Sequence, residues 1–319
     1  MTTLSAGGTP SPRIKRILIA VDLSSVSARA AAYVRYLAAP GAQVRVVSVA
    51  ENPRTLLPLG SLTDAALQTA RAELLRDASE AAAHAKEAFA NGNGAVEADV
   101  IELSRHGGYT ANALIDAATE WKADLLVVGA RQHRGILRWV EGTVSESVTT
   151  QTPCSILVVP ASYDAEIPEF PRRILFALDG SPASLDAMQF GLQLATPEAH
   201  LRAVYVIDRA VRLTDFVPIH VLEDAFIEEG KTALANAAGV FANLSNHVET
   251  GLLRTKPTSD DVPHTIVREA ERWHADLVVV GTHGRRGLAR WFLGSVAART
   301  ARIAQTPLLL ARPRPDSSA

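Results

Sequence analysis

The chain has little of what several protein classes require. Its one cysteine, Cys154, excludes an intrachain disulfide, which fits a reducing compartment. No run approaches the roughly 20 apolar residues of a spanning helix, and residues 1–13 lack the apolar core of a secretory signal. Lys and Arg number 32 against 34 for Asp and Glu, so no overall field attracts nucleic acid. We expect a cytoplasmic protein with neither a nucleic acid nor a membrane as partner.

A long repeat divides the 319 residues into two halves. Trp121–Gly129 (WKADLLVVG) returns as Trp273–Gly281 (WHADLVVVG), an offset of 152, and the match continues without a gap through the following loop. A period of this length indicates duplicated whole domains. We expect one domain at residues 14–161 and a second at residues 172–312, joined by a linker.

Each half alternates short apolar runs with helical stretches, which is typical of β-α-β units around a parallel sheet buried on both faces. Right-handed crossovers between five such strands predict a doubly wound α/β domain with its ligand crevice at the carboxyl ends of the strands. The strands expected in the second half are Ile174–Leu178, Leu201–Ile207, Val248–Leu253, Leu277–Val280 and Leu308–Ala311.

The final strand of each half would leave an open apolar sheet edge. These strands are Ile156–Val159 and Leu308–Ala311. An unpaired apolar edge favours association, so we expect the two strands to pair with each other or with a second chain. Pairing within the chain joins the two domains, and a further homodimer is an open alternative.

A glycine-rich loop in the second half is suited to phosphate. Gly281 and Gly284 follow a strand, and Gly294 and Ser295 open a helix, in the spacing G-x2-G-x9-G-S. Glycine allows the backbone to approach an anion closely, and the free N–H groups at a helix start point at it. Arg290 within the loop would add a charge-assisted contact. Ordinary turn glycines and solvated arginines are the alternative interpretation.

The equivalent loop of the first half departs from this pattern. Gln132 stands at the position of Gly284, and Thr143 stands at that of Ser295. The hydroxyl of Thr is a tolerable replacement, but Gln132 puts a side chain where backbone would have to meet phosphate. We therefore expect the second half to bind and the first half to bind weakly or not at all.

The order of elements, the aspartate that closes the first strand of each half (Asp22 and Asp179), and the glycine spacing together resemble the universal stress protein family, tandem type. The resemblance implies two five-stranded sheets of order 3-2-1-4-5 and ATP or a related adenine nucleotide as ligand. It also implies that Asp179 contacts the nucleoside and that Val206 borders the base. An aspartate before a helix is also a common turn residue. The phosphate and ribose contacts implied by the resemblance are Gly281, Gly284, Gly294 and Ser295.

Nothing in the sequence indicates a catalytic or metal site. His283 has no recognisable acid/base partner nearby in the sequence, and the nine histidines show no metal-ligand spacing. Mg²⁺ could accompany a nucleotide, although no P-loop motif indicates it. We predict a stress-response sensor or regulator that binds nucleotide. The alternatives are a weak ATP hydrolase, and a carrier of a hydrophobic ligand that would use the apolar loops 53–62 and 211–222.

Overall fold

The computed structural model describes residues 14–35, 37–39, 41–56, 63–89, 95–130, 144–163, 171–209, 219–256, 260–283 and 293–312. Across these ranges, no helix has both the length and the apolar character that crossing a membrane requires.

The first half contains five strands and the helices that connect them. In chain order its elements are β1 (Arg16–Val21), α1 (Ser25–Arg35), β2 (Gln43–Ala50), α2 (Pro53–Leu56), α3 (Asp64–Ala88), β3 (Val96–Glu102), α4 (Leu103–His106), α5 (Thr110–Glu120), β4 (Leu125–Ala130), α6 (Val144–Gln151) and β5 (Ser155–Pro160).

The second half repeats this plan. All five strands that the sequence predicts are present, with ends that agree to within one residue. The elements are β6 (Arg173–Leu178), α7 (Pro182–Gly191), a 3-10 turn (Leu192–Leu194), β7 (His200–Ile207), α8 (Ile219–Phe241), β8 (Val248–Arg254), α9 (Val262–Arg272), β9 (Leu277–Gly281), α10 (Ser295–Ile303) and β10 (Leu308–Ala311).

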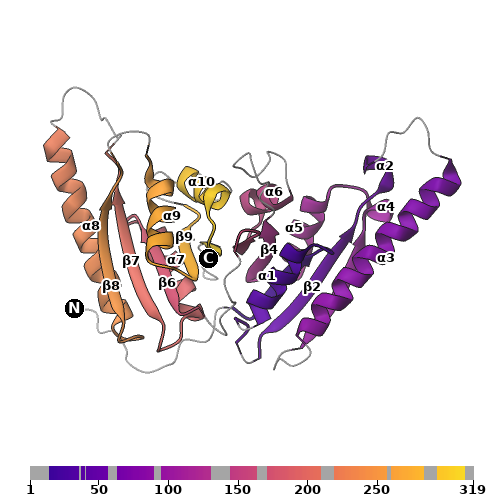
Figure 1. Ribbon diagram of the computed structural model, residues 1–319, viewed down its shortest axis with the longest axis horizontal. Helices are drawn as coiled ribbons and strands as arrows, with labels where there is room; N and C mark the ends of the chain where they lie inside the picture. Colours follow the sequence, from indigo (N-terminus) through magenta and orange to yellow (C-terminus); the bar gives the residue numbers. More distant parts are fainter. Residues whose placement is uncertain are drawn as a thin grey trace, which may run out of the picture.

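The strands form one ten-stranded sheet in the order β3-β2-β1-β4-β5-β10-β9-β6-β7-β8. Each half therefore has the order 3-2-1-4-5 that the resemblance implied, with parallel pairing inside each half. The halves join where β5 and β10 run antiparallel, with Leu157 opposite Leu309. The predicted pairing of the final strands within the chain is confirmed. The long helices α3 and α8 lie at the two far ends of the molecule (Figure 1).

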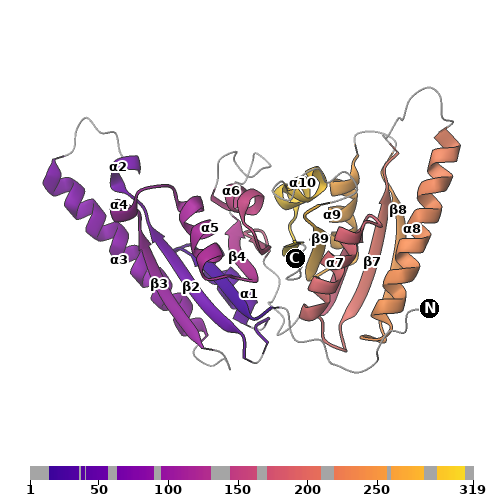
Figure 2. The same ribbon diagram turned by 180° about the vertical axis from the view of Figure 1, so that it is seen from behind.

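Helices cover both faces of the sheet, which explains why the strands are apolar throughout. Ile17 and Ile19 of β1 face a core shared with α1, α3, α7 and α8. Leu18, between them, faces the opposite core, which includes side chains from α5, α6, α9 and α10. Each of the two cores contains residues from both halves, so the halves share both cores. Figure 2 shows α6 and α10 close together at the middle of the molecule, as Figure 1 does from the other side.

The start of α7 illustrates how the sequence specifies these helices. Ser181 is its N-cap, and the Oγ of Ser181 accepts a hydrogen bond from the N–H of Ser184 at 3.2 Å. Pro182 occupies the first turn, where its missing N–H costs no hydrogen bond. Met188 and Phe190 then turn a buried side toward the sheet.

Candidate functional site

Several site residues expected in the second half lie at one end of the sheet. Because β6 and β9 are parallel neighbours, Asp179 and Gly281 lie at adjacent strand ends. The N–H of Gly294 donates to the carbonyl of Thr282 at 2.8 Å, which brings the start of α10 to the end of β9. Ser295, the first residue of α10, therefore reaches the same edge.

The remaining expectations for the second half fall in different places. Val206 lies in β7, one residue before its end, and packs partly buried against the α9 and α10 face of the sheet. Gly284 and Arg290 lie outside the described residues, as do Gln132 and Thr143 of the first half and most of the two apolar loops, residues 57–62 and 211–218.

Asp179 organises the turn that leads into α7. One carboxylate oxygen, Oδ1, accepts hydrogen bonds from the N–H and the hydroxyl of Ser181, at 3.0 Å and 2.6 Å. Gly180, between them, has φ of 80°, which favours glycine. Asp22 does the same in the first half, accepting from the N–H of Ser24 at 2.9 Å. Both aspartates therefore have a turn role, and a nucleoside contact at Asp179 stays a prediction.

The glycine at the end of the fourth strand has a packing role in both halves. A Cβ on Gly129 would lie 2.8 Å from Cγ1 of Val26 in α1 and 3.1 Å from its backbone. A Cβ on Gly281 would lie 3.3 Å from the carbonyl oxygen of His283 and 3.5 Å from that of Ala183 in α7. In the first half, α1 can approach the sheet this closely only if glycine stands at position 129. At Gly281 the tighter contact is with the segment after β9, and the distance to α7 is an ordinary van der Waals contact.

The start of α10 is suited to an anion. Its N-cap, Gly294, makes no side-chain capping hydrogen bond, whereas Ser181 caps α7 and Asp261 caps α9 through their side chains. A Cβ on Gly294 would lie 3.1 Å from the carbonyl oxygen of Thr282, a tight contact that favours glycine. Among the described residues, therefore, no N-cap side chain pairs with the first-turn N–H groups of α10, which carry the positive end of the helix dipole.

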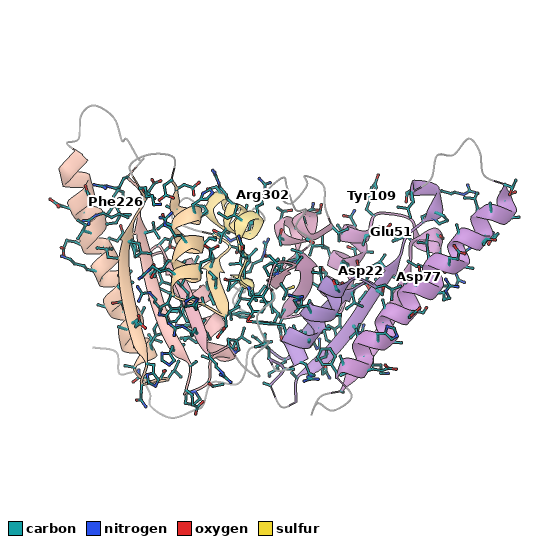
Figure 3. The ribbon with its side chains drawn as sticks, in the orientation of Figure 1. Asp22, Glu51, Asp77, Tyr109, Phe226 and Arg302 are labelled. Atoms are coloured by element: carbon teal, nitrogen blue, oxygen red, sulfur yellow. The ribbon has the colours of Figure 1, made fainter. Side chains whose placement is uncertain are left out.

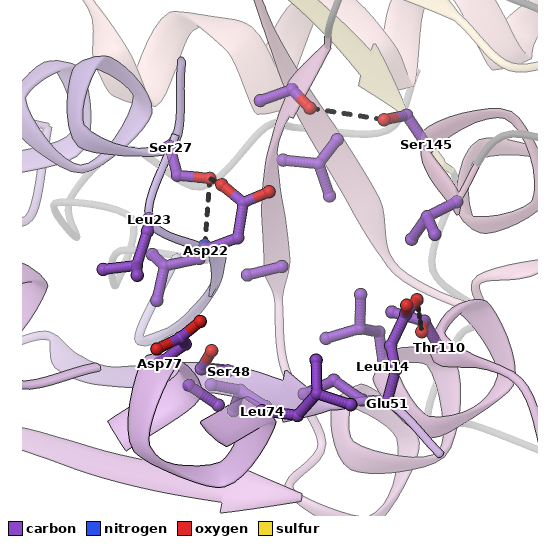
Figure 4. Close-up of a pocket in the computed structure, with 18 of the residues that line it drawn as sticks. Asp22, Leu23, Ser27, Ser48, Glu51, Leu74, Asp77, Thr110, Leu114 and Ser145 are labelled. Atoms are coloured by element: carbon purple, nitrogen blue, oxygen red, sulfur yellow. Dashed lines mark hydrogen bonds between the residues drawn. The ribbon is translucent and has the colours of Figure 1, made fainter. Parts of the chain in front are cut away.

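A cavity of about 660 Å³ opens in the first half, at the carboxyl ends of β1, β2 and β4. Figure 4 shows hydroxyl and carboxylate groups around it, including Ser48 and Asp77. Glu51 accepts a hydrogen bond from the hydroxyl of Thr110 at 2.9 Å, and Ser145 donates to the carbonyl of Gly129 at 3.2 Å.

The cavity lies at the carboxyl ends of the strands, where the fold class places a ligand crevice, but its acidic lining was not predicted. Its acidic residues Asp22, Glu51 and Asp77 come from the ends of two strands and from the long helix, as Figure 3 shows. One difference between the halves outside the glycine loop could have indicated the cavity. Ser48 stands where the second half has the much larger Tyr205.

The profile of the Universal stress protein family matches residues 13–160 and 171–312. A universal stress protein of Mycolicibacterium smegmatis is 30% identical over 208 residues, which cover 64% of this chain and 66% of that protein, so the chain spans just under two thirds of that relative. A solved universal stress protein from Archaeoglobus fulgidus covers 94% of this chain and 98% of its own, with 16% identity and a TM-score of 0.60, and shares the fold. Another solved universal stress protein, in complex with cAMP, is 25% identical and covers 45% of this chain and 99% of its own, with a TM-score of 0.34. Because the family profile covers most of the sequence in two separate matches, this chain belongs to the universal stress protein family and carries two of its domains in one polypeptide.

Proposed function

We propose that the protein is a cytoplasmic stress-response sensor or regulator that binds ATP or a related adenine nucleotide in its second domain. The observation that supports the proposal is the uncapped start of α10 beside the end of β9, next to Asp179. Phosphate groups are stabilised by the N–H groups at such a helix start. The hydroxyl of Ser295 and the backbone at Gly294 would complete the contacts.

The rest of the proposed site follows the crevice between β6 and β9. Asp179 would accept hydrogen bonds from the nucleoside, while Val206 would border the base. Gly284 and Arg290 would contact the phosphates. Any Mg²⁺ would enter with the nucleotide. Among the described residues, no group of three or more His, Cys, Asp and Glu side chains converges as metal ligands.

We further propose that residues 14–161 and 172–312 act as two domains of different function. Gln132 would block phosphate in the first domain, so adenine nucleotide would bind once per chain. Binding would shift a conformational or partner equilibrium only as far as the affinities of its two states for the nucleotide differ. A homodimer would add a second nucleotide site per assembly.

Calorimetric titration with ATP and with AMP tests the assignment. Gly284→Gln should weaken ATP binding by about tenfold or more, because a buried anion contact is lost. Its matched control is Gln132→Gly in the first domain, which should leave the affinity unchanged or create a new weak site. Equal effects of both substitutions would contradict the proposed asymmetry.

Two measurements separate the proposal from its rivals. Phosphate release from ATP that disappears in Ser295→Ala would favour a hydrolase. Mass spectrometry of small molecules extracted from the purified protein would reject the nucleotide assignment if it recovered a lipid and no adenine nucleotide.

A further inference from the structure

The cavity of the first domain lies where one strand side chain is much smaller than its equivalent in the second domain. The strand pairs β1–β2 and β6–β7 share one register, so residues 157 apart are equivalent and Ser48 matches Tyr205. Tyr205 is only 3% exposed. Its ring packs against Gly230 of α8, where a Cβ would lie 2.8 Å from Cδ1 of Tyr205.

The long helices complete the comparison. The buried residues of α3 match those of α8 at an offset of 152, as Phe89 matches Phe241 and Ala85 matches Ala237. Gly230 is therefore equivalent to Ala78, which lines the cavity. In the second domain a tyrosine ring fills the space beside the long helix, and in the first domain a serine leaves that space open.

Ser48 is a buried polar residue that lines the cavity. It is only 2% exposed, and its hydroxyl points into the cavity (Figure 4). Across the described ranges the structure records no hydrogen-bond partner for this hydroxyl. A ligand with a donor or acceptor at this depth would form a hydrogen bond with this hydroxyl.

The described residues that line the cavity carry charge of one sign. Asp22 follows β1, Glu51 follows β2, and Asp77 lies on α3, so three carboxylates from three elements line the space. Among the described lining residues there is no Lys, Arg or His. The guanidinium of exposed Arg76 lies 3.4 Å from Asp77, at the surface side of the helix. Such a setting repels phosphate and attracts a positive charge.

The remaining walls combine apolar side chains with the hydroxyls of Ser27, Thr110 and Ser145. Val49 and Val128 come from strands, and Leu74 and Leu114 come from helices on opposite faces of the sheet. A space of about 660 Å³ has the size typical of small-molecule sites. Apolar walls suit a flat ring, and the carboxylates suit a group that donates hydrogen bonds.

We infer that the first domain contains a second ligand site, selective for an organic cation that joins a protonated amine to a flat apolar ring. The amine would bind among Glu51, Asp77 and Asp22, and the ring would pack on Val49, Leu74 and Leu114. The inference goes beyond the proposed nucleotide site because it concerns the other domain and the opposite ligand charge.

Two probes with the same ring and opposite charge test this inference on the full chain. Tryptamine and indole-3-acetate are titrated by calorimetry. Tryptamine should bind saturably, one molecule per chain, and indole-3-acetate should not bind. Asp77→Asn and Glu51→Gln should each weaken tryptamine binding by about tenfold, the loss expected for one charge-assisted hydrogen bond. Glu87→Gln, an exposed carboxylate on the same helix, is the matched control and should leave the affinity unchanged.

A double substitution copies the second domain directly. Ser48→Tyr with Ala78→Gly should fill the cavity and abolish tryptamine binding, and its thermal unfolding reports whether the domain still folds. Absence of saturable tryptamine binding, equal binding of both probes, or binding that survives both Asp77→Asn and Glu51→Gln would overturn the inference. ATP titration separates the two proposals, since Asp77→Asn should not change ATP affinity, and loss of ATP binding in the unmodified chain affects only the nucleotide proposal.

Discussion

The hydroxyl of Tyr33 in the first domain donates a hydrogen bond to the carbonyl oxygen of Asp276 in the second, at 2.9 Å. Tyr33 is 2% exposed and lies on α1, and Asp276 immediately precedes β9. The ring of Tyr163, from the segment after β5, meets the ring of Tyr33 edge to face at 6.0 Å. The contact between the domains is therefore built like a protein core, with two buried aromatic rings. The hydroxyl of Tyr33 has its hydrogen bond, whereas that of Tyr163 is buried with no partner among the described residues.

Removing this hydrogen bond should destabilise the protein. Tyr33→Phe leaves the buried carbonyl of Asp276 without its donor, so the free energy of unfolding should fall by about 1 kcal/mol or more. Urea unfolding followed by circular dichroism measures the change. Tyr109→Phe is the control, because that ring is 73% exposed and its substitution should have no measurable effect.

The same tyrosines predict a loss of stability in alkali. Burial raises the pKa of Tyr163 to about 12, and it raises the pKa of Tyr33 well above its usual range. A tyrosine in the unfolded chain has a pKa of about 10. The folded state therefore favours the neutral phenol, and this stabilisation is complete below about pH 10 and is lost as the pH rises toward about 12.

Urea titrations at a series of alkaline pH values test this dependence. The free energy of unfolding of the unmodified protein should fall more steeply above about pH 10 than that of Tyr163→Phe, which has lost one of the ionising groups. Parallel pH profiles for the two proteins would show that Tyr163 ionises as freely in the folded state as in the unfolded state.

The packing role of Gly129 predicts opposite effects for two glycine substitutions. Gly129→Ala would force its Cβ against Val26 of α1, at a cost of about 1–3 kcal/mol. Gly239→Ala in α8 meets nothing within 4 Å and should stabilise the helix by about 0.5–1 kcal/mol. Thermal unfolding of the two variants measures both changes. Similar shifts in the same direction would contradict the packing role.

The strands that join the domains predict cooperative unfolding. Leu309 of β10 is fully buried opposite Leu157 of β5, so Leu309→Ala should cost about 2–5 kcal/mol. Since both cores are continuous across the junction, the unmodified protein should unfold in one calorimetric transition. Two well-separated transitions would show that the domains unfold independently. Leu244→Ala, at a residue 45% exposed, is the control.

The strands could be predicted because the information is local and strongly patterned, and their order was implied by the family resemblance. A strand buried on both faces is apolar throughout, so runs such as Leu277–Val280 have only a few alternatives. The open apolar edges at residues 156–159 and 308–311 made their mutual pairing predictable. The start of α7 could be predicted as well, because Ser181 is a preferred N-cap residue and Pro182 suits the first turn of a helix.

The first-domain cavity could not be predicted in the same way because it depends on contacts between distant residues. Ser48 and Ala78 become neighbours only through the packing of α3 on β2. Their equivalents in the second domain, Tyr205 and Gly230, lie 157 and 152 residues further along the chain, so no single alignment offset reveals the pair. The assignment of Gly281 to phosphate stays a prediction. The tight contact of Gly129 with Val26 of α1 likewise depends on packing that a sequence pattern does not reveal.

The most direct test of the nucleotide assignment is photolabelling with 8-azido-ATP, followed by mass spectrometry of the labelled peptides. The account predicts label on peptides from residues 172–312, prevented by excess ATP. Label confined to residues 14–161, around the cavity that contains Ser48 and Asp77, would contradict it.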